Sequence, residues 1–400
     1  INKAVTLSNV TIDDGNNGKN YNVALVNSNN SIINQAPLTV AAANDAKFVT
    51  TNDVSGYAGL IINGFVGGET TSALSGTGVI TRTNAAVNSA GTYAGVLQPS
   101  GFSSANYSIN YVNGSYTIVP AQTLLVRVAP ATTAYGTAPS YTMTAQYMPA
   151  SSCTANCAPI SLTPTNNGLI TINDGAGSSA SFALTANNPV FSTSGYLRTG
   201  GYNLVNSNTT LTGNNFLSLQ VVGTLTVLPK SIAAANLGVS GLTKVYDGNS
   251  SISGLTLNVN SANSQILTND QVFVAATGTF ANIDVGVNKA ISVNVDLTGA
   301  DAGNYSLTDR QLTGNLGTIT QLASVTWVGG ASTNNWSNAA NWANGAIPVR
   351  GNVAQINIPT AANIIYDSGV VGQLASSSTI INNGTITFNS PSAFTFANNV

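Results

Sequence analysis

Tyr116-Thr117-Ile118-Val119-Pro120 closes one run of strand-forming residues, and Leu124-Leu125-Val126-Arg127-Val128 opens another almost at once. The same arrangement returns where Thr224-Leu225-Thr226-Val227-Leu228-Pro229 runs into the residues that follow, and further junctions fall at Pro37 and Gln321. Proline ends a strand because it cannot donate to the hydrogen-bond ladder and because its φ angle is fixed. Recurrence of such junctions indicates an array of modules, so a single domain built around one pocket is disfavoured.

Shorter motifs also recur along the chain. Ile1-Asn2-Lys3-Ala4-Val5 reappears as Val287-Asn288-Lys289-Ala290-Ile291, and each copy is followed by an alternating run and a turn rich in Asp, Gly and Asn. Asn-Tyr pairs accompany these repeats at Asn20-Tyr21, Asn106-Tyr107 and Asn304-Tyr305, with an inverted pair at Tyr202-Asn203.

The composition predicts an all-β fold. Only 6% of the 400 residues are charged, and there is no His and a single Glu, Glu69. Helix formers such as Glu, Lys, Gln and Arg are scarce, whereas Val, Thr, Asn, Ser and Gly, which suit short strands and tight turns, are abundant. We expect tandem small modules of the β-sandwich or β-grasp-like kind.

Charge and residue types also disfavour several classes of function. A net charge of −2 leaves no basic stripe for nucleic acid or for anionic membranes. No apolar run approaches the roughly 20 residues that span a bilayer. Without His, acid–base catalysis at neutral pH is poorly supplied, so we expect no enzyme activity, no catalytic residue and no cofactor. A Lys–Asn cross-link at Lys3 or Lys289 has no supporting motif.

The junctions divide the chain into segments. Residues 1–36 resemble the second half of the unit at 230–321, so the chain is expected to be a piece cut at both ends. The segments are 1–36, 37–120, 121–229, 230–321 and a last one, 322–400, in which Trp and Gly give way to short parallel-strand rungs typical of a β-solenoid. Since the linkers are short and stiff, the sequence predicts a rod.

The motifs of these segments resemble modules of filamentous-haemagglutinin-like adhesins of two-partner secretion. Lys244-Val245-Tyr246-Asp247-Gly248-Asn249 is similar to the module named for its Tyr-Asp-Gly motif, so residues 1–36 and 230–321 are expected to be of that type. Asn63-Gly64-Phe65-Val66-Gly67-Gly68-Glu69 and Tyr111-Val112-Asn113-Gly114-Ser115-Tyr116-Thr117-Ile118 resemble the MBG module. The resemblance implies a secreted protein of the bacterial outer surface, and an outer-membrane transporter as a partner.

One signature of the MBG type separates the two units that resemble it. Residues 121–229 carry it as Ala134-Tyr135-Gly136, whereas residues 37–120 have Lys47-Phe48-Val49-Thr50 where Tyr-Gly is usual. We therefore expect the first turn of the earlier unit to differ.

Cys153 and Cys157 are the only thiols. A metal site would need further Cys or His ligands, and a redox motif usually separates its two cysteines by two residues. The spacing favours a disulfide that closes a small projecting loop in an oxidising compartment. Retention of the protein at the cell surface through this loop is disfavoured, because a long segment follows it.

Two clusters leave alternatives open. Trp327, Trp336 and Trp342 could stack on a carbohydrate, but their spacing with Asn and Gly favours a structural cap on the solenoid. Asp13 and Asp14 offer oxygen ligands for calcium, although Asp, Asn and Gly are also the residues of any tight turn, which is favoured. No metal site is assigned.

These observations lead to one expected function and two alternatives. The chain is expected to be a non-catalytic segment of a large secreted adhesin or biofilm-matrix protein, acting as a stiff stalk in cell–cell or cell–surface adhesion. The first alternative is a self-assembling extracellular filament or surface-layer protein, since exposed strand edges can pair between copies. The second is a carbohydrate-binding module.

Overall fold

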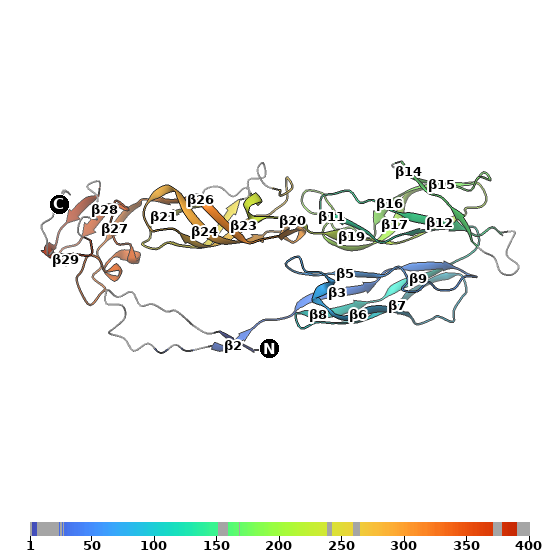
Figure 1. The fold of residues 1–400 in the computed structure, drawn as a ribbon, viewed down its shortest axis with the longest axis horizontal. Coiled ribbons are helices and arrows are strands. Elements are labelled where there is room, and N and C mark those ends of the chain that lie inside the picture. The colour runs from blue at the N-terminus through green and yellow to red at the C-terminus, as the bar shows by residue number, and fades with distance from the viewer. Residues whose placement is uncertain are drawn as a thin grey trace.

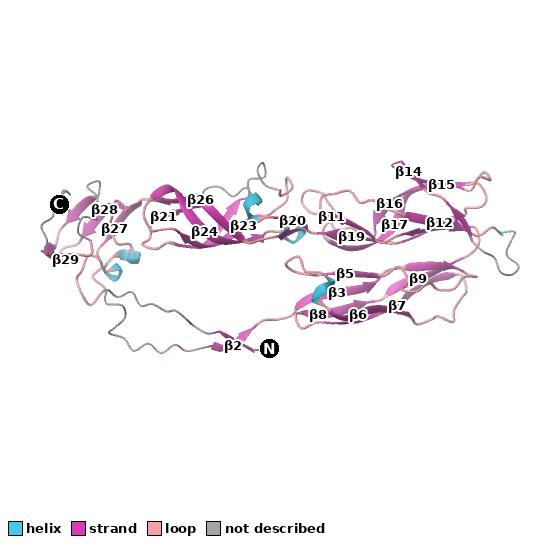
Figure 2. Cartoon of the chain, in the orientation of Figure 1, coloured by secondary structure: helices cyan, strands magenta, loops and turns pink. Residues whose placement is uncertain are grey.

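The computed structural model confirms the all-β class (Figure 2). The structure describes residues 2–5, 24, 26, 28–150, 159–167, 169–237, 242–258, 265–370 and 378–389. Within these residues every helix is a short 3₁₀ turn, and none is long and apolar enough to cross a membrane.

Residues 36–119 fold into two facing sheets. Their elements are β3 (Ala36–Ala42), β4 (Asp45–Phe48), β5 (Leu60–Asn63), η1 (Thr71–Ala73), β6 (Ser75–Arg82), β7 (Gly91–Ser103), β8 (Tyr107–Val112) and β9 (Gly114–Val119). One sheet has the order β5-β3-β8 and the other β4-β9-β7-β6. The buried residues of each sheet alternate along the strands, so the module has its own core.

Residues 123–228 repeat this plan with insertions. Their strands are β10 (Thr123–Val128), β11 (Ala131–Ala134), β12 (Met143–Tyr147), β13 (Ile160–Leu162), β14 (Thr165–Asn167), β15 (Leu169–Asn173), β16 (Ser179–Ala186), β17 (Gly200–Thr212), β18 (Ser218–Val222) and β19 (Thr224–Leu228). The sheets have the orders β13-β12-β10-β18 and β11-β19-β17-β16-β15-β14.

Residues 230–320 form the next unit. Their elements are β20 (Lys230–Ile232), η3 (Ala234–Leu237), β21 (Leu242–Val245), β22 (Ser251–Asn258), β23 (Phe273–Phe280), β24 (Gly286–Thr298), η4 (Ala302–Asn304), β25 (Tyr305–Leu307) and β26 (Gln311–Thr320). The sheet β21-β26-β24-β23-β22 faces the short parallel pair β20-β25.

The last segment pairs its strands in parallel. It contains β27 (Leu322–Thr326), η5 (Ala339–Asn341), η6 (Ala343–Gly345), β28 (Val353–Ile358), β29 (Asn363–Asp367), β30 (Thr379–Asn382) and β31 (Thr385–Asn389). β27, β28 and β30 stack in one register, and β29 stacks on β31 in another. Successive turns of the chain therefore lie directly above one another.

The predicted half-module at residues 1–36 lies mostly outside the described residues. Its described parts are the strands β1 (Asn2–Val5) and β2 (Ser28–Ile32), which pair antiparallel.

A shared topology sets where the chain enters and leaves each module. In all of them the opening strands lie parallel to the closing strands: β3 to β8 and β4 to β9, β10 to β18 and β11 to β19, β20 to β25 and β21 to β26. Because parallel strands run in the same direction, the chain enters at one pole and leaves at the opposite pole. Modules of this kind can follow one another along a line.

The expected rod is realised from residue 121 onward and is wrong for the module before it. Figure 1 shows strands β10–β31 in line along the long axis, whereas residues 36–119 lie folded back beside β11–β19. At Pro229 the strand β19 runs directly into β20. After Pro120, by contrast, a turn intervenes in which Gln122 adopts a left-handed backbone with φ of 63°. This turn reverses the chain.

Candidate functional site: the joints between modules

In each module, the residue directly after the second opening strand bonds to the end of the last closing strand. The N–H of Val49 donates to the carbonyl of Val119, 3.1 Å away, and the N–H of Tyr135 donates to the carbonyl of Leu228 at 2.9 Å. In the third module the N–H of Tyr246 donates to Thr320 at 2.9 Å. The Tyr-Gly and Tyr-Asp-Gly signatures therefore stand at the exit pole, where the next module begins.

Tyr135 fastens the second module to the third. Its ring is buried, and its hydroxyl donates to Oδ2 of Asp270 at 2.6 Å. The hydroxyl of Tyr305, which belongs to one of the Asn-Tyr pairs, bonds to the same oxygen, and the two rings meet edge to face with centroids 5.4 Å apart. Burial and, next, the hydrogen bond to Asp270 raise the pKa of Tyr305 far above its usual range, so the hydroxyl keeps its proton.

A second polar cluster completes this joint. Arg198 pairs with Asp301 across the boundary, with its Nη2 2.7 Å from Oδ1 of a carboxyl whose side chain is fully buried. The hydroxyl of Thr193 shares its one proton between Oδ2 of Asp301 and the carbonyl of Asn269, which lies 2.6 Å away. Burial acts to raise the pKa of Asp301, but its hydrogen bonds, led by that of Thr193, and the charge of Arg198 outweigh burial and hold the pKa below its usual range.

Glycine after the signature tyrosines lets the next module approach closely. Gly136 and Gly248 each have φ of +82°, a conformation that side-chain-bearing residues rarely adopt. A Cβ atom on Gly136 would lie 2.6 Å from Cδ1 of Leu267, and one on Gly248 would lie 2.5 Å from the carbonyl oxygen of Gly345. Both contacts belong to the following module, so the glycines are needed at the joint as well as in the turn.

Tyr246 makes the corresponding joint to the C-terminal segment. Its hydroxyl donates to the carbonyl of Ile347 at 2.7 Å. Beside it, Arg350 pairs with Asp284 at 2.8 Å, and Oδ1 of Asn352 accepts from the N–H of Val285 at 2.8 Å. One apolar core runs without a break from Leu124 through both joints to Ile380. From residue 121 onward the modules therefore share a continuous interior.

The tryptophans belong to this interior, where their rings leave almost no exposed surface for the alternative of carbohydrate contact. Trp336, Trp342 and Trp327 are 0%, 1% and 5% exposed. Trp336 donates its indole N–H to the carbonyl of Pro348 at 3.1 Å, and Trp342 donates to that of Trp336 at 2.7 Å. A sugar needs an exposed ring face to stack upon, and these faces pack against one another edge to face. All three rings therefore pack inside the C-terminal segment, and their role as a cap stays a prediction.

The folded-back module contacts its neighbour through directional hydrogen bonds. Asn63 receives the N–H of Gly201 on Oδ1 and donates from Nδ2 to the carbonyl of Gly201 at 3.2 Å. The N–H of Asn44 donates to Oδ1 of Asn203, in the inverted Tyr-Asn pair, at 2.9 Å. A Cβ atom on Gly201 would lie 2.8 Å from Cγ2 of Ile61, so only glycine allows this approach.

A buried ion pair and a small apolar cluster complete this lateral contact. Nη1 of Arg127 lies 2.7 Å from Oδ1 of Asp45, and the two side chains are 27% and 0% exposed. Burial raises the pKa of Asp45, although the charge of Arg127 opposes the rise. Phe48, next to Val49 at the position without Tyr-Gly, is buried against Leu125 and Met148 of the neighbour. The module that lacks the Tyr-Gly signature is thus the one that folds back against its neighbour.

A charged centre inside the first module escaped the sequence analysis. Asp53 pairs with Lys47 at 2.9 Å and with Arg82 at 2.8 Å, and the guanidinium of Arg82 lies 4.3 Å from the ring centroid of Tyr116. Burial acts to raise the pKa of Asp53, but the hydrogen bond and charge of Lys47 and the charge of Arg82 hold it below its usual range. The sequence did contain one signal for this cluster, because charged residues are rare in this chain. Charges that are buried in a protein are paired, so Lys47, Asp53 and Arg82 could have been expected to interact.

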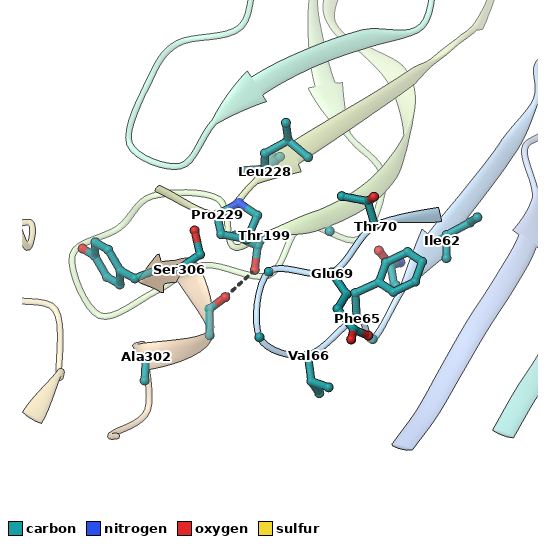
Figure 3. Close-up of a pocket in the computed structure, with 18 of the residues that line it drawn as sticks. Ile62, Phe65, Val66, Glu69, Thr70, Thr199, Leu228, Pro229, Ala302 and Ser306 are labelled. Carbon is teal, nitrogen blue, oxygen red and sulfur yellow. Dashed lines mark hydrogen bonds between the residues drawn. The ribbon is translucent and has the colours of Figure 1, made fainter. Parts of the chain in front are cut away.

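Folding back also encloses a cleft of about 570 Å³ between the modules (Figure 3). The loop that follows β5 supplies Phe65, Val66 and Glu69, and the facing wall contains Leu228 and Pro229 from the end of β19. Residues of the third module, among them Ser306 and Arg310, close the far side. The hydroxyl of Tyr107 bonds to the Glu69 carboxylate. The cleft combines apolar walls with the Glu69 carboxylate and the Asp296–Arg310 ion pair, an arrangement that suits a ligand.

Two family models match parts of this chain. The MBG domain (YGX type) matches residues 38–117, and the YDG domain matches residues 229–312. The chain therefore carries modules of the repeat type that the sequence motifs indicated. No curated protein and no solved structure matches the chain. The assignment of residues 121–229 to the MBG type rests on their motifs and on the shared strand plan.

Other predicted residues fall elsewhere. Cys153 and Cys157, and the turn at Asp13 and Asp14, lie outside the described residues. Lys289 donates to Oδ1 of Asn282, on an exposed part of the third module.

Proposed function

We propose that this chain is a segment of a large secreted bacterial adhesin or biofilm-matrix protein, in which the modules form a stiff extracellular stalk. Two-partner secretion through an outer-membrane transporter belongs to the same proposal and is supported by the motifs alone. The MBG and YDG matches support the adhesin-like class.

The observation that carries the stalk proposal is the parallel pairing of opening and closing strands. When the chain is pulled from both ends, tension enters along β10 or β11 and leaves along β18 or β19, which run beside them in the same direction. Hydrogen bonds perpendicular to the pull are then loaded together, in shear, and cannot open one at a time. The polar joints at Tyr135 and Tyr246 pass the load to the next module.

Single-molecule stretching tests this proposal. Residues 121–321, held by handles at their ends, are expected to resist as two units that each yield in one abrupt step. Moving the handles to the two ends of the β16–β17 hairpin in the second module would peel the hairpin's hydrogen bonds apart one after another, and serves as the control. Equal yield forces in the two geometries would contradict a shear-loaded stalk.

Electron microscopy separates the stalk from a self-assembling filament. Isolated thin particles at micromolar concentration are expected for a stalk. Regular filaments with a subunit repeat would favour the alternative, in which exposed strand edges pair between copies.

A second candidate, a ligand-binding module, is favoured by the cleft. Its apolar walls, the Glu69 carboxylate and the Asp296–Arg310 ion pair suit a ligand that carries an apolar group beside a polar or charged one. Screening the chain against peptide and glycan arrays, with Val66→Asp and Glu69→Gln as matched variants, tests this function. Binding that survives both substitutions would place the ligand elsewhere.

A further inference from the structure

The two modules that pack side by side are each complete without the other. Residues 36–119 bury Tyr116 and Leu97 in one cluster and Tyr107 and Val40 in another, within the module's own sheets. In the second module the central core, around Phe182, likewise lies between its own sheets. The apolar cluster shared by the pair is small and lies at their rim around Phe48. Separation of the pair therefore leaves both folds intact.

The connection between them is short and strained. Only Pro120, Ala121 and Gln122 separate β9 from β10, and Gln122 has a left-handed backbone although it is not glycine. The equivalent joint at Pro229 is straight, with β20 beginning at the next residue. An extended connection is thus a conformation that this chain already uses, and adopting it at Gln122 would relieve the strained residue.

The lateral contact is specific enough to form between molecules. Its polar part consists of the Asp45–Arg127 ion pair and of hydrogen bonds that join Asn63 to Gly201 and Asn44 to Asn203. Every partner on one side belongs to the first module, and every partner on the other side belongs to the second. Two copies with straight connections can therefore make each contact twice, with none left unsatisfied.

We propose that the chain exchanges these modules with a second copy of itself, so that residues 36–119 of each copy pack on residues 123–228 of the other. A reciprocal exchange closes into a dimer because both interfaces are filled. Short hinges under strain favour exchange over closure within one chain. This partner goes beyond the stalk proposal and does not depend on it.

Engineered cysteines test the exchange directly. A Cβ atom on Gly201 would lie 3.6 Å from Cβ of Ile61, within the range that a disulfide requires. In a background with both native cysteines replaced by serine, one 400-residue chain carries Ile61→Cys and a second, isotopically labelled, carries Gly201→Cys. The mixture is expected to yield a disulfide-linked dimer with one chain of each kind, identified by intact mass without reductant.

The double variant Ile61→Cys/Gly201→Cys is the control for geometry. It is expected to close a disulfide within one chain in the monomer fraction and between chains in the dimer fraction. A closed monomer with no mixed dimer at any concentration would overturn the exchange. Absence of any disulfide in the double variant would show that the lateral contact does not form, and would overturn it as well.

Hinge variants give an independent measurement that keeps the Asp45–Arg127 pair and the bonds of Asn63. Both variants lose the side-chain bond from Gln122 to the carbonyl of Asn214, and proline also loses the N–H bond to the carbonyl of Met148. Gln122→Gly accepts the left-handed backbone, so the fraction of dimer in sedimentation velocity is expected to fall. Gln122→Pro cannot adopt it, since proline fixes φ near −65°, so that fraction is expected to rise. An unchanged dimer fraction in both variants would contradict the role of the hinge in exchange.

Discussion

Tyr135 and Tyr305 donate their hydroxyl protons to the same carboxylate oxygen, Oδ2 of Asp270, from the two sides of one joint. Tyr135 comes from the exit pole of the second module, and Tyr305 lies on β25 of the third. A single carboxylate thus links a signature residue of one module to a repeated motif of the next, and the joint depends on sequence features that both modules retain.

Removal of one hydroxyl from this joint should weaken it. Tyr135→Phe keeps the buried ring but leaves Asp270 with one tyrosine donor fewer, so the free energy of unfolding should fall by about 1.5–3 kcal/mol, as for a hydrogen bond to a charged group. Urea denaturation followed by fluorescence measures the change. Tyr196→Phe, at an exposed ring that contacts Tyr135, is the control and should have little effect.

The loss of stability on replacing glycine by alanine should depend on which atoms the added Cβ would meet. Gly175→Ala faces no atom within 4 Å and carries only the cost of a left-handed residue, about 1–2 kcal/mol. Gly136→Ala meets the flexible end of Leu267 and should cost somewhat more. Gly248→Ala meets the backbone carbonyl of Gly345 and should cost at least about twice the Gly175→Ala value.

Thermal and urea denaturation of the three alanine variants measure this order. Small-angle scattering should also show that Gly248→Ala alters the alignment of residues 322–389, whereas Gly175→Ala should not. Equal losses at the three positions would mean that backbone conformation alone, and not module docking, selects glycine.

Acid should weaken the joint between the second and third modules. Because the folded-state pKa of Asp301 is lowered from its ordinary 3.8, the ionised carboxylate stabilises the folded chain above that value. This contribution is lost as the pH falls through 3.8 toward the lower folded-state pKa. Unfolding free energies measured between about pH 6 and pH 2.5 should therefore decline more steeply for the natural chain than for Asp301→Asn.

Loss of the lateral ion pair should open the folded-back pair. Arg127→Met removes the charge that faces Asp45 and leaves that buried carboxylate without a cation, a change that typically costs about 3–5 kcal/mol in a buried pair and less where, as here, Arg127 is partly exposed. Small-angle scattering should report a larger maximum dimension.

A substitution that separates the two modules by steric clash is the matched control for the loss of charge at Arg127. Gly201→Val places side-chain atoms against Ile61 without altering any charge, and should increase the dimension similarly. If both variants keep the dimensions of the natural chain, the lateral contact contributes little to holding the modules together.

The all-β class could be predicted because it depends on local signals. Low charge, strand-forming runs and prolines report on neighbouring residues, and the strands β9, β19 and β26 end at Val119, Leu228 and Thr320, next to the predicted junctions. The absence of Tyr-Gly at Val49 and Thr50 was also visible in the sequence, but the folding back of this module could not be inferred from it.

The lateral contact could not be predicted because it joins residues far apart in sequence. Asn63 and Gly201 are 138 positions apart, and neither belongs to a pattern that demands a partner. The reversing turn gave no signal either, since glutamine at Gln122 is an unusual choice for a left-handed backbone. For the tryptophans, spacing alone does not distinguish an aromatic platform from an aromatic core, and only their burial decides.

Because the chain reverses at Gln122, the distance between its ends is not proportional to the number of its modules. Pro37, where the chain enters the first module, adjoins Gly64, and the neighbouring Asn63 contacts Gly201 beside the end of β19. Entry and exit of the pair therefore lie at the same end (Figure 1). Residues 37–228 therefore add almost nothing to the distance between the point where the chain enters the pair and the point where it leaves, so an end-to-end distance computed by counting modules would be too long.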